Sequence, residues 1–219
     1  MVRLPLTARA VLFDWDGTLL DSYHADARAY LAMFRALGIG WDVSDLARHY
    51  SPNWHRVYRA AKIPPSLWKE ADRLWKKAYE KESPRLLPGA RRVLRELEPR
   101  FLLGLVTSGN SYRVRRQLHE FRIRQVFSAC VCNEDAPRRK PHPAPLELAL
   151  RRLRIKPEAC VYVGDTPDDI EMARRASVRA IAVLGPFPTH DRLRAIRPDI
   201  LLDSIAELPN WVAQDAGQT

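Results

Sequence analysis

Short apolar segments alternate with helical patterns after about residue 85, and this alternation restricts the possible folds more than any other feature of the chain. The apolar segments are Phe101 to Val106, Val126 to Val131, Cys160 to Val163, Ala180 to Leu184, and Ile200 to Leu202. Strands separated by helices are typical of a parallel sheet with crossover helices. The expected fold is therefore α/β, and ligands of such sheets bind at the carboxyl ends of the strands.

Residues 22–84 differ, because they contain helical patterns and no strand-like run. Residues that share a helix face are Ala27, Tyr30, Leu31 and Phe34, and then Ala71, Leu74, Trp75 and Ala78. The segment also holds four of the six tryptophans, Trp41, Trp54, Trp68 and Trp75. Aromatic residues at helical spacing usually pack in a core, so we interpret the tryptophans as core and not as a ligand cage. Residues 22–84 are expected to form a separate all-α domain, inserted into a core made of residues 1–21 and 85–219.

Composition and charge exclude several classes of protein. No apolar run approaches the roughly 20 residues that span a bilayer, and no signal-type segment precedes the first strand, so we expect a cytoplasmic protein without membrane contact. Cys130, Cys132 and Cys160 lie in strand-like contexts and are expected to be reduced and buried.

The net charge of +10 raises the question of a nucleic-acid partner. The basic residues are dispersed, however, and are interleaved with glutamates on predicted surface helices. They include Arg91, Arg92, Arg95, Arg113, Arg115, Arg116, Arg151, Arg152 and Arg154. A solvated surface is therefore favoured over a nucleic-acid patch.

The first predicted strand, beginning at Val11, ends abruptly in Asp14, Asp16, Gly17 and Thr18. Carboxylates are costly to desolvate unless a cation or a reacting group neutralises them, and a divalent hard metal meets that need. The turn thus offers Asp14 as a nucleophile and Asp16 as a proton-transfer group. The alternative is an ordinary Asx-type turn after a strand.

Two further segments have the chemistry of an anion site. A strand ends at Thr107, Ser108 and Gly109, where a hydroxyl and backbone N–H groups meet the start of a helix; turn and capping roles are the alternative. Lys140 lies in a stretch stiffened by Pro141 and Pro143, so its ammonium suits a phosphoryl group, with a solvated basic loop as the alternative.

A fourth segment carries another carboxylate after a strand. Thr166, Pro167 and Asp169 form the pattern of a capped helix start. Capping does not account for Asp165, which is placed where a metal ligand facing Asp14 would lie. All four segments lie at carboxyl ends of predicted parallel strands, so their chemistry converges on one crevice.

With these four motifs in order, the sequence resembles the haloacid dehalogenase superfamily hydrolases of the phosphoglycolate-phosphatase-like and beta-phosphoglucomutase-like subgroup, which carry a helical cap. The resemblance implies a Rossmann-like, doubly wound sheet and a Mg²⁺-dependent phosphatase that forms an aspartyl-phosphate. It implies Asp14 as nucleophile, Asp16 as general acid and base, and Lys140 as the cation that neutralises nucleophile and phosphate. It further implies phosphate binding by Thr107 with Ser108 or Gly109, metal binding by Asp14, Asp16 (through its carbonyl) and Asp165, and support of the metal or of Lys140 by Asp169.

Other activities stay open. A sugar-phosphate mutase keeps both aspartates, whereas dehalogenase and phosphonate-cleaving relatives are disfavoured because they lack one at position 16. A non-catalytic module that binds nucleic acid or a protein is the competing class, although every catalytic position holds a competent residue. The expected partner is a small phosphorylated metabolite, and the expected state is a monomer or a homodimer.

The predicted cap contains a polar and aromatic loop around residues 48–56. We predict that some of His49, Asn53 and Arg56 contact the leaving group, with an ordinary surface loop as the alternative. Residues 22–84 hold eleven Lys or Arg against seven Asp or Glu. That excess of four does not select one substrate.

Overall fold

The computed structural model describes residues 8–213, with side chains to residue 211. Its centre is a sheet of six strands in the order β5-β4-β1-β6-β7-β8, and every adjacent pair is parallel. The strands are β1 (Ala10–Phe13), β4 (Leu102–Val106), β5 (Ala129–Val131), β6 (Cys160–Gly164), β7 (Arg179–Val183) and β8 (Ile200–Leu202). The predicted doubly wound α/β fold is confirmed.

The register of the central strands determines where the motifs meet. Phe13 lies opposite Leu105 on one side and opposite Val163 on the other. The strands therefore end at nearly the same level, and the residues that follow them share one edge of the sheet.

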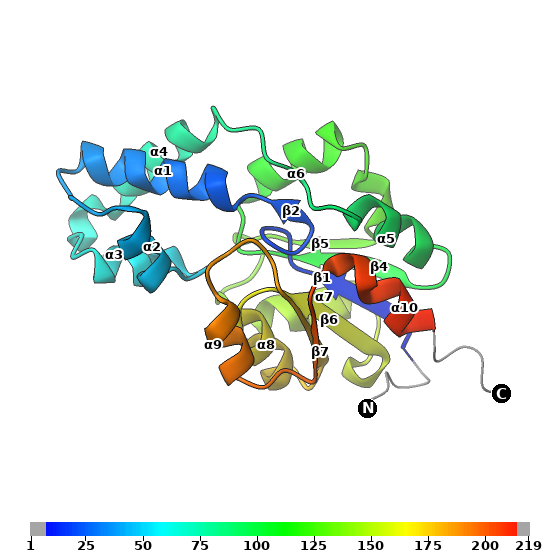
Figure 1. Ribbon diagram of the computed structural model, residues 1–219. Helices are drawn as coiled ribbons and strands as arrows, with labels where there is room; N and C mark the ends of the chain where they lie inside the picture. Colours follow the sequence, from blue (N-terminus) through cyan, green and yellow to red (C-terminus); the bar gives the residue numbers. More distant parts are fainter. Residues whose placement is uncertain (1–7, 214–219) are drawn as a thin grey trace.

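Helices cover both faces of the sheet (Figure 1). One face is covered by α5 (Ala90–Leu97), α6 (Ser111–Glu120) and α10 (Leu208–Ala213), and the other by α7 (Ala144–Leu153), α8 (Pro167–Arg175) and α9 (His190–Ala195). Side chains of a strand alternate between the faces. Accordingly, Phe13 belongs to the first apolar cluster and Leu12 to the second.

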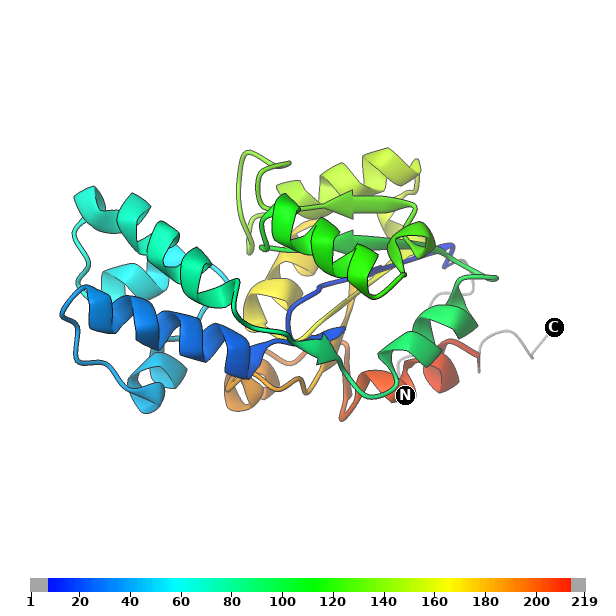
Figure 2. The same cartoon turned by 90° about the horizontal axis from the view of Figure 1, so that it is seen from above.

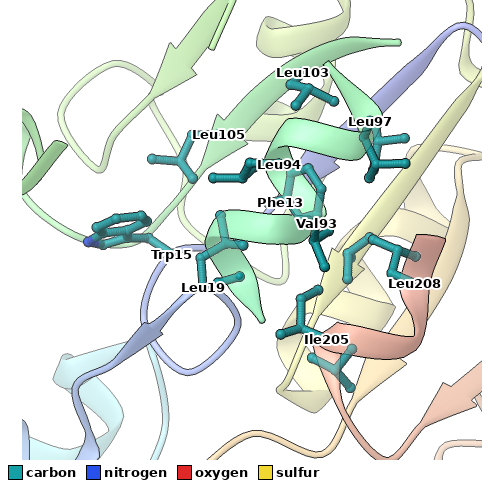
Figure 3. Packing of buried hydrophobic residues seen from close by; sticks show 14 of the residues in the cluster. Phe13, Trp15, Leu19, Val93, Leu94, Leu97, Leu103, Leu105, Ile205 and Leu208 are labelled. Carbon is teal, nitrogen blue, oxygen red and sulfur yellow. The ribbon is translucent and has the colours of Figure 1, made fainter. Parts of the chain in front are cut away.

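The α5 face is closely packed. Figure 3 shows Val93, Leu94 and Leu97 of α5 against Phe13 and the strands, with α10 alongside. Fully burying one such aliphatic side chain contributes about 1.5–3 kcal/mol. This packing holds one face of β1 in place, and with it the residues that follow its carboxyl end.

Helices α1 (Tyr23–Ala36), α2 (Val43–His49), α3 (Trp54–Ala60) and α4 (Trp68–Tyr79) form a separate layer, which we call the helical insert (residues 22–84). It projects from the sheet edge, and α1 and α4 run side by side (Figures 1 and 2). Its own apolar cluster includes Met33, Phe34, Leu46 and Val57. The chain enters and leaves it through β2 (Leu20–Asp21) and β3 (Arg85–Leu86), which pair antiparallel.

The expectations of no membrane-spanning segment and of reduced, buried cysteines concern the helices and the strands. Within residues 8–213, no helix has both the length and the apolar character needed to cross a membrane. The three cysteines are free; Cys132 and Cys160 are buried, and Cys130 is half-buried with its Sγ 3.7 Å from that of Cys132.

Candidate active site

Lys140 lies at the centre of the site and is only 2% exposed. Its Nζ lies 2.8 Å from Asp14 Oδ1 and 2.7 Å from Asp169 Oδ1, and it donates a hydrogen bond to the Tyr162 hydroxyl. Burial opposes the ammonium charge, but the two carboxylates outweigh it and raise the pKa of Lys140 above its ordinary value. The alternative of a solvated basic loop is wrong for this residue.

Asp14 follows β1 directly, and its amide donates to the Val163 carbonyl, which ties it to the neighbouring strand β6. Burial raises the pKa of Asp14 to about 7, and the nearby Lys140 limits the rise. With this raised pKa, the protonated and the ionised forms of Asp14 are both populated at neutral pH, and the Lys140 ammonium beside it favours the ionised form.

Carboxylate oxygens of Asp14, Asp165 and Asp169 lie within 4.8 Å of one another, and all three residues are buried. Thr18 donates to Asp165 Oδ1 at 3.0 Å, whereas Asp165 Oδ2 is buried without a hydrogen-bond partner in the described part of the chain. Burial, and then the Asp14 carboxylate, raise the pKa of Asp165 well above its ordinary value. Clustered buried oxygens with one unused acceptor fit a divalent hard cation.

Asp169 has a different place in this cluster. Its Oδ1 accepts from Lys140 and Tyr162, and its Oδ2 accepts from the amide and hydroxyl of Thr166. Both oxygens are thus occupied by protein donors. Asp169 thus lies beside Lys140, the position expected of a supporting residue. It lies in the first turn of α8 and forms the predicted capping box with Thr166.

Asp16 is held apart from the cluster by Arg113. The guanidinium binds both carboxylate oxygens, at 2.8 Å to Oδ1 and 2.5 Å to Oδ2. Burial would raise the pKa of Asp16, but the charge and hydrogen bonds of Arg113 lower it overall. The Asp16 side chain therefore does not join Asp14, Asp165 and Asp169 in this structure.

Arg113 was not predicted as a site residue and was expected on the solvated surface, but it is buried, with an exposure of 8%. It lies in the first turn of α6, capped by Asn110, and its guanidinium also contacts Tyr79 of the helical insert. A helix start disfavours a cation because of the helix dipole. An arginine in the first turn of a helix therefore indicates that an acidic group lies nearby, and this is the feature from which Arg113 could have been predicted as a site residue.

The segment after β4 leads into the same corner. The Thr107 hydroxyl accepts a hydrogen bond from the Gly109 amide at 3.0 Å, and Thr107, Ser108 and Gly109 all line the crevice. A Cβ at Gly109 would lie 2.4 Å from the Arg113 guanidinium. A side chain at this position would therefore displace the Arg113 guanidinium from its contact with Asp16.

A cavity of about 470 Å³ separates the sheet edge from the helical insert. Its base includes Asp14, Asp16, Thr107 and Arg113. Aromatic rings that line it come from both layers and are Tyr30, Tyr50, Trp54, Tyr58, Trp75, Tyr79, Tyr112 and Phe187. The interpretation of all four insert tryptophans as core alone is wrong, because Trp54 and Trp75 pack on the insert cluster and also face the cavity.

The three residues predicted to contact the leaving group lie outside this lining. His49 stacks on Trp41, with ring centroids 5.2 Å apart, and Asn53 is the residue before α3. Arg56 forms an ion pair with Asp168 of α8 at 3.0 Å. Their neighbours Ser51, Pro52 and Trp54 line the cavity instead.

Contacts between the helical insert and the sheet domain hold the insert over the cavity. Asp168 also accepts from the Ser51 hydroxyl, Arg192 donates to the Tyr50 carbonyl, and the Tyr50 and Phe187 rings stack at 4.6 Å. These contacts come from α8 and α9 and the loop between β7 and α9. The catalytic edge is thus covered in this conformation.

The sequence profile of the haloacid dehalogenase-like hydrolases matches residues 11–183, which include all four motifs and the insert. The chain belongs to this family. The predicted hydrolase resemblance is thereby confirmed, and the family's use of a divalent metal agrees with the buried carboxylates.

This chain is similar to several known proteins over nearly their whole length. The chain is 26% identical over 210 residues to the pyrophosphatase PpaX of Oceanobacillus iheyensis, and the alignment covers 93% of this chain and 96% of the relative. It is 29% identical over 229 residues to the phosphoglycolate phosphatase of Escherichia coli K12, covering 91% and 90%. The structure of CbbY from Rhodobacter sphaeroides in complex with phosphate superposes with a TM-score of 0.79, at 26% identity, covering 92% and 96%.

Proposed function

We propose that this protein is a Mg²⁺-dependent phosphatase that hydrolyses a small-molecule phosphate monoester through an aspartyl-phosphate on Asp14. The observation that carries the proposal is the Asp14 carboxylate beside the buried Lys140 ammonium, at the base of a covered cavity. The phosphatase names of the relatives support the same reaction class.

The first half-reaction transfers the phosphoryl group to the protein. An Asp14 oxygen forms a bond to phosphorus while the ester P–O bond breaks, and Asp16 gives its proton to the departing alkoxide. Lys140, the Thr107 hydroxyl and Ser108 hold the charge on the phosphoryl oxygens. Mg²⁺ bound by Asp14, Asp165 and the Asp16 carbonyl would supply further positive charge there.

The second half-reaction returns Asp14 to its starting state. Asp16, now a carboxylate, takes a proton from water, and the oxygen of that water attacks phosphorus while the bond to Asp14 breaks. Inorganic phosphate leaves, and Asp16 is protonated for the next cycle. Because Arg113 occupies both Asp16 oxygens in the structure, we propose that Asp16 turns away from Arg113 before it exchanges protons.

We further propose that the helical insert, residues 22–84, is a cap domain on a core of residues 1–21 and 85–219. The cavity between the two layers supports a role in excluding water during phosphoryl transfer. Substrate contact by His49, Asn53 or Arg56 stays a prediction, as do a cytoplasmic location and a monomeric or homodimeric state.

The test is phosphate release from p-nitrophenyl phosphate, with Mg²⁺ or with EDTA, by the wild type, Asp14→Asn and Asp16→Asn. We expect turnover with Mg²⁺, and a loss of about 10³-fold or more in each variant. Equal rates in wild type and Asp14→Asn would contradict the covalent mechanism. Isomerisation of a sugar phosphate without net phosphate release would indicate a mutase instead.

A further inference from the structure

The helical insert lines one side of the cavity. Two helices of the insert line it with residues about one turn apart: Asp26 and Tyr30 of α1, and Asp72, Trp75 and Lys76 of α4. Residues at this spacing share one helix face. The ceiling of the cavity is therefore aromatic, with two carboxylates facing the same space.

Asp26 is the more enclosed of these carboxylates. It is half-buried, and the only hydrogen bond to its carboxylate within the described residues comes from the Trp75 indole Nε1, at 3.2 Å to Oδ1. It forms none of the ion pairs found among residues 8–211. Asp26 thus keeps acceptor capacity on the cavity side, since a carboxylate has about four lone-pair sites.

The two arginines of the cavity lining are already engaged. Arg113 binds Asp16 and lies 5.0 Å from the Tyr79 ring centre. The Arg139 guanidinium donates to Asn133, approaches the His55 ring nitrogen at 3.0 Å and covers the Trp54 ring. In the structure, an anionic leaving group beside Asp26 would therefore meet a carboxylate while the Arg113 charge is shared with Asp16.

Lys76 is the remaining cation of the lining. It is exposed, and its ammonium lies 5.4 Å from the centre of the Tyr112 ring. Asp72 is exposed as well and accepts from the Tyr58 hydroxyl at 2.8 Å, so the exposed part of this lining carries one charge of each sign. Asp26 is the enclosed charge on this side of the cavity, and it can accept hydrogen bonds.

We propose that the substrate is a monophosphate ester whose leaving group is uncharged and carries a hydroxyl that donates to Asp26, as in a small polyol or sugar-like alcohol. A leaving group with a carboxylate or a second phosphate is rejected, because like charges brought together in a desolvated pocket are strongly unfavourable. Aromatic rings beside Asp26 pack on the carbon skeleton of the alcohol. This inference rests on the proposed phosphatase function.

Two matched pairs of substrates isolate the charge. Glycerol 3-phosphate and 3-phosphoglycerate, like 2-hydroxyethyl phosphate and 2-phosphoglycolate, differ by a hydroxymethyl group against a carboxylate. Phosphate release is measured with Mg²⁺ at pH 8, above the pKa of about 7 to which burial raises Asp26. We expect the hydroxyl member of each pair to have a kcat/KM at least about tenfold higher.

Three variants assign the effect to Asp26. Asp26→Asn should bring the ratio within each pair to about threefold or less, whereas Asp26→Glu, which keeps the charge, should retain most of it. Glu80→Gln, at the exposed end of α4, is the matched control and should leave the ratio unchanged. Circular dichroism and thermal unfolding show that each variant is folded.

The outcomes separate the inference from the function on which it rests. Turnover of p-nitrophenyl phosphate together with equal or better turnover of the carboxylated esters would overturn the inference and leave the phosphatase proposal intact. An unchanged ratio in Asp26→Asn would overturn the role of Asp26. Absence of turnover on every ester, p-nitrophenyl phosphate included, would overturn both.

Discussion

Two carboxylates at the end of β1, two residues apart, are paired with cations in different ways. Asp14 contacts Lys140, which is also held by Asp169 and Tyr162, so every partner belongs to the sheet domain. Asp16 contacts Arg113, which also touches Tyr79 of the helical insert. The proposed nucleophile is thus held by the sheet domain alone, while the proposed proton-transfer residue is linked through Arg113 to the helical insert.

The largest expected effect comes from breaking the contact within the sheet domain. Lys140→Met should lower kcat/KM by about 10²–10³-fold, because the charge of the transferring phosphoryl group loses a preorganised cation. The measurement is Mg²⁺-dependent phosphate release under saturating and limiting substrate. Activity within about threefold of wild type would show that Lys140 only supports the fold.

Metal binding should stabilise the same part of the sheet domain. At Mg²⁺ about 100-fold above its Kd, the free energy of unfolding should rise by about 2.7 kcal/mol. Asp165→Asn should not show this increase. Without metal, the variant should unfold at the same temperature as wild type or at a higher one, because one of three mutually repelling buried carboxylates is gone. Thermal unfolding with and without Mg²⁺ measures both. An undiminished shift in the variant would exclude Asp165 as a ligand.

The pair that joins the two layers should respond less. Arg113→Gln should lower the free energy of unfolding by about 2 kcal/mol, since it removes two charge-assisted hydrogen bonds to Asp16. We expect kcat to fall by less than about tenfold, because Asp16 must leave this contact to exchange protons. Urea unfolding and steady-state kinetics test the two parts separately. A loss as large as that of Lys140→Met would place Arg113 in the chemical step.

The smallest effect is expected at the outer contact of the insert. Arg56→Ala removes an ion pair in which Arg56 is exposed and Asp168 is buried. Because Asp168 keeps its hydrogen bond from Ser51, the loss of stability should be about 1 kcal/mol. The substitution should raise KM a few-fold through a looser insert and leave the ratio of kcat/KM between substrates unchanged. A changed ratio would instead support the sequence prediction that Arg56 contacts the leaving group. Lys62→Ala, on an exposed turn after α3, is the control.

The sheet edge could be predicted from the sequence because its geometry is local to each strand. Asp14, Thr107 and Asp165 each follow an apolar run, and parallel strands bring such positions together whatever the helices do. Their meeting at one edge required no knowledge of long-range packing.

The ceiling of the cavity could not be predicted in the same way. Tyr30 and Trp75 recur at helical spacing with core residues, and periodicity does not distinguish a face that packs on a helix from one that faces a cavity. Arg113 was missed for a related reason: its partner, Asp16, is distant in sequence, and an arginine on a helix is usually solvated. Contacts between layers depend on how the layers dock.

The short antiparallel pairing of β2 with β3 has a consequence for how this enzyme can be altered. Leu20 faces Leu86 and Asp21 faces Arg85, so the insert leaves and rejoins the chain at adjacent points. The insert therefore behaves like a surface loop whose two ends are paired with each other. The entropic cost of closing such a loop rises only slowly with the number of residues in it. A different set of helices can therefore be grafted at these two points while β1 and its carboxylates keep their support.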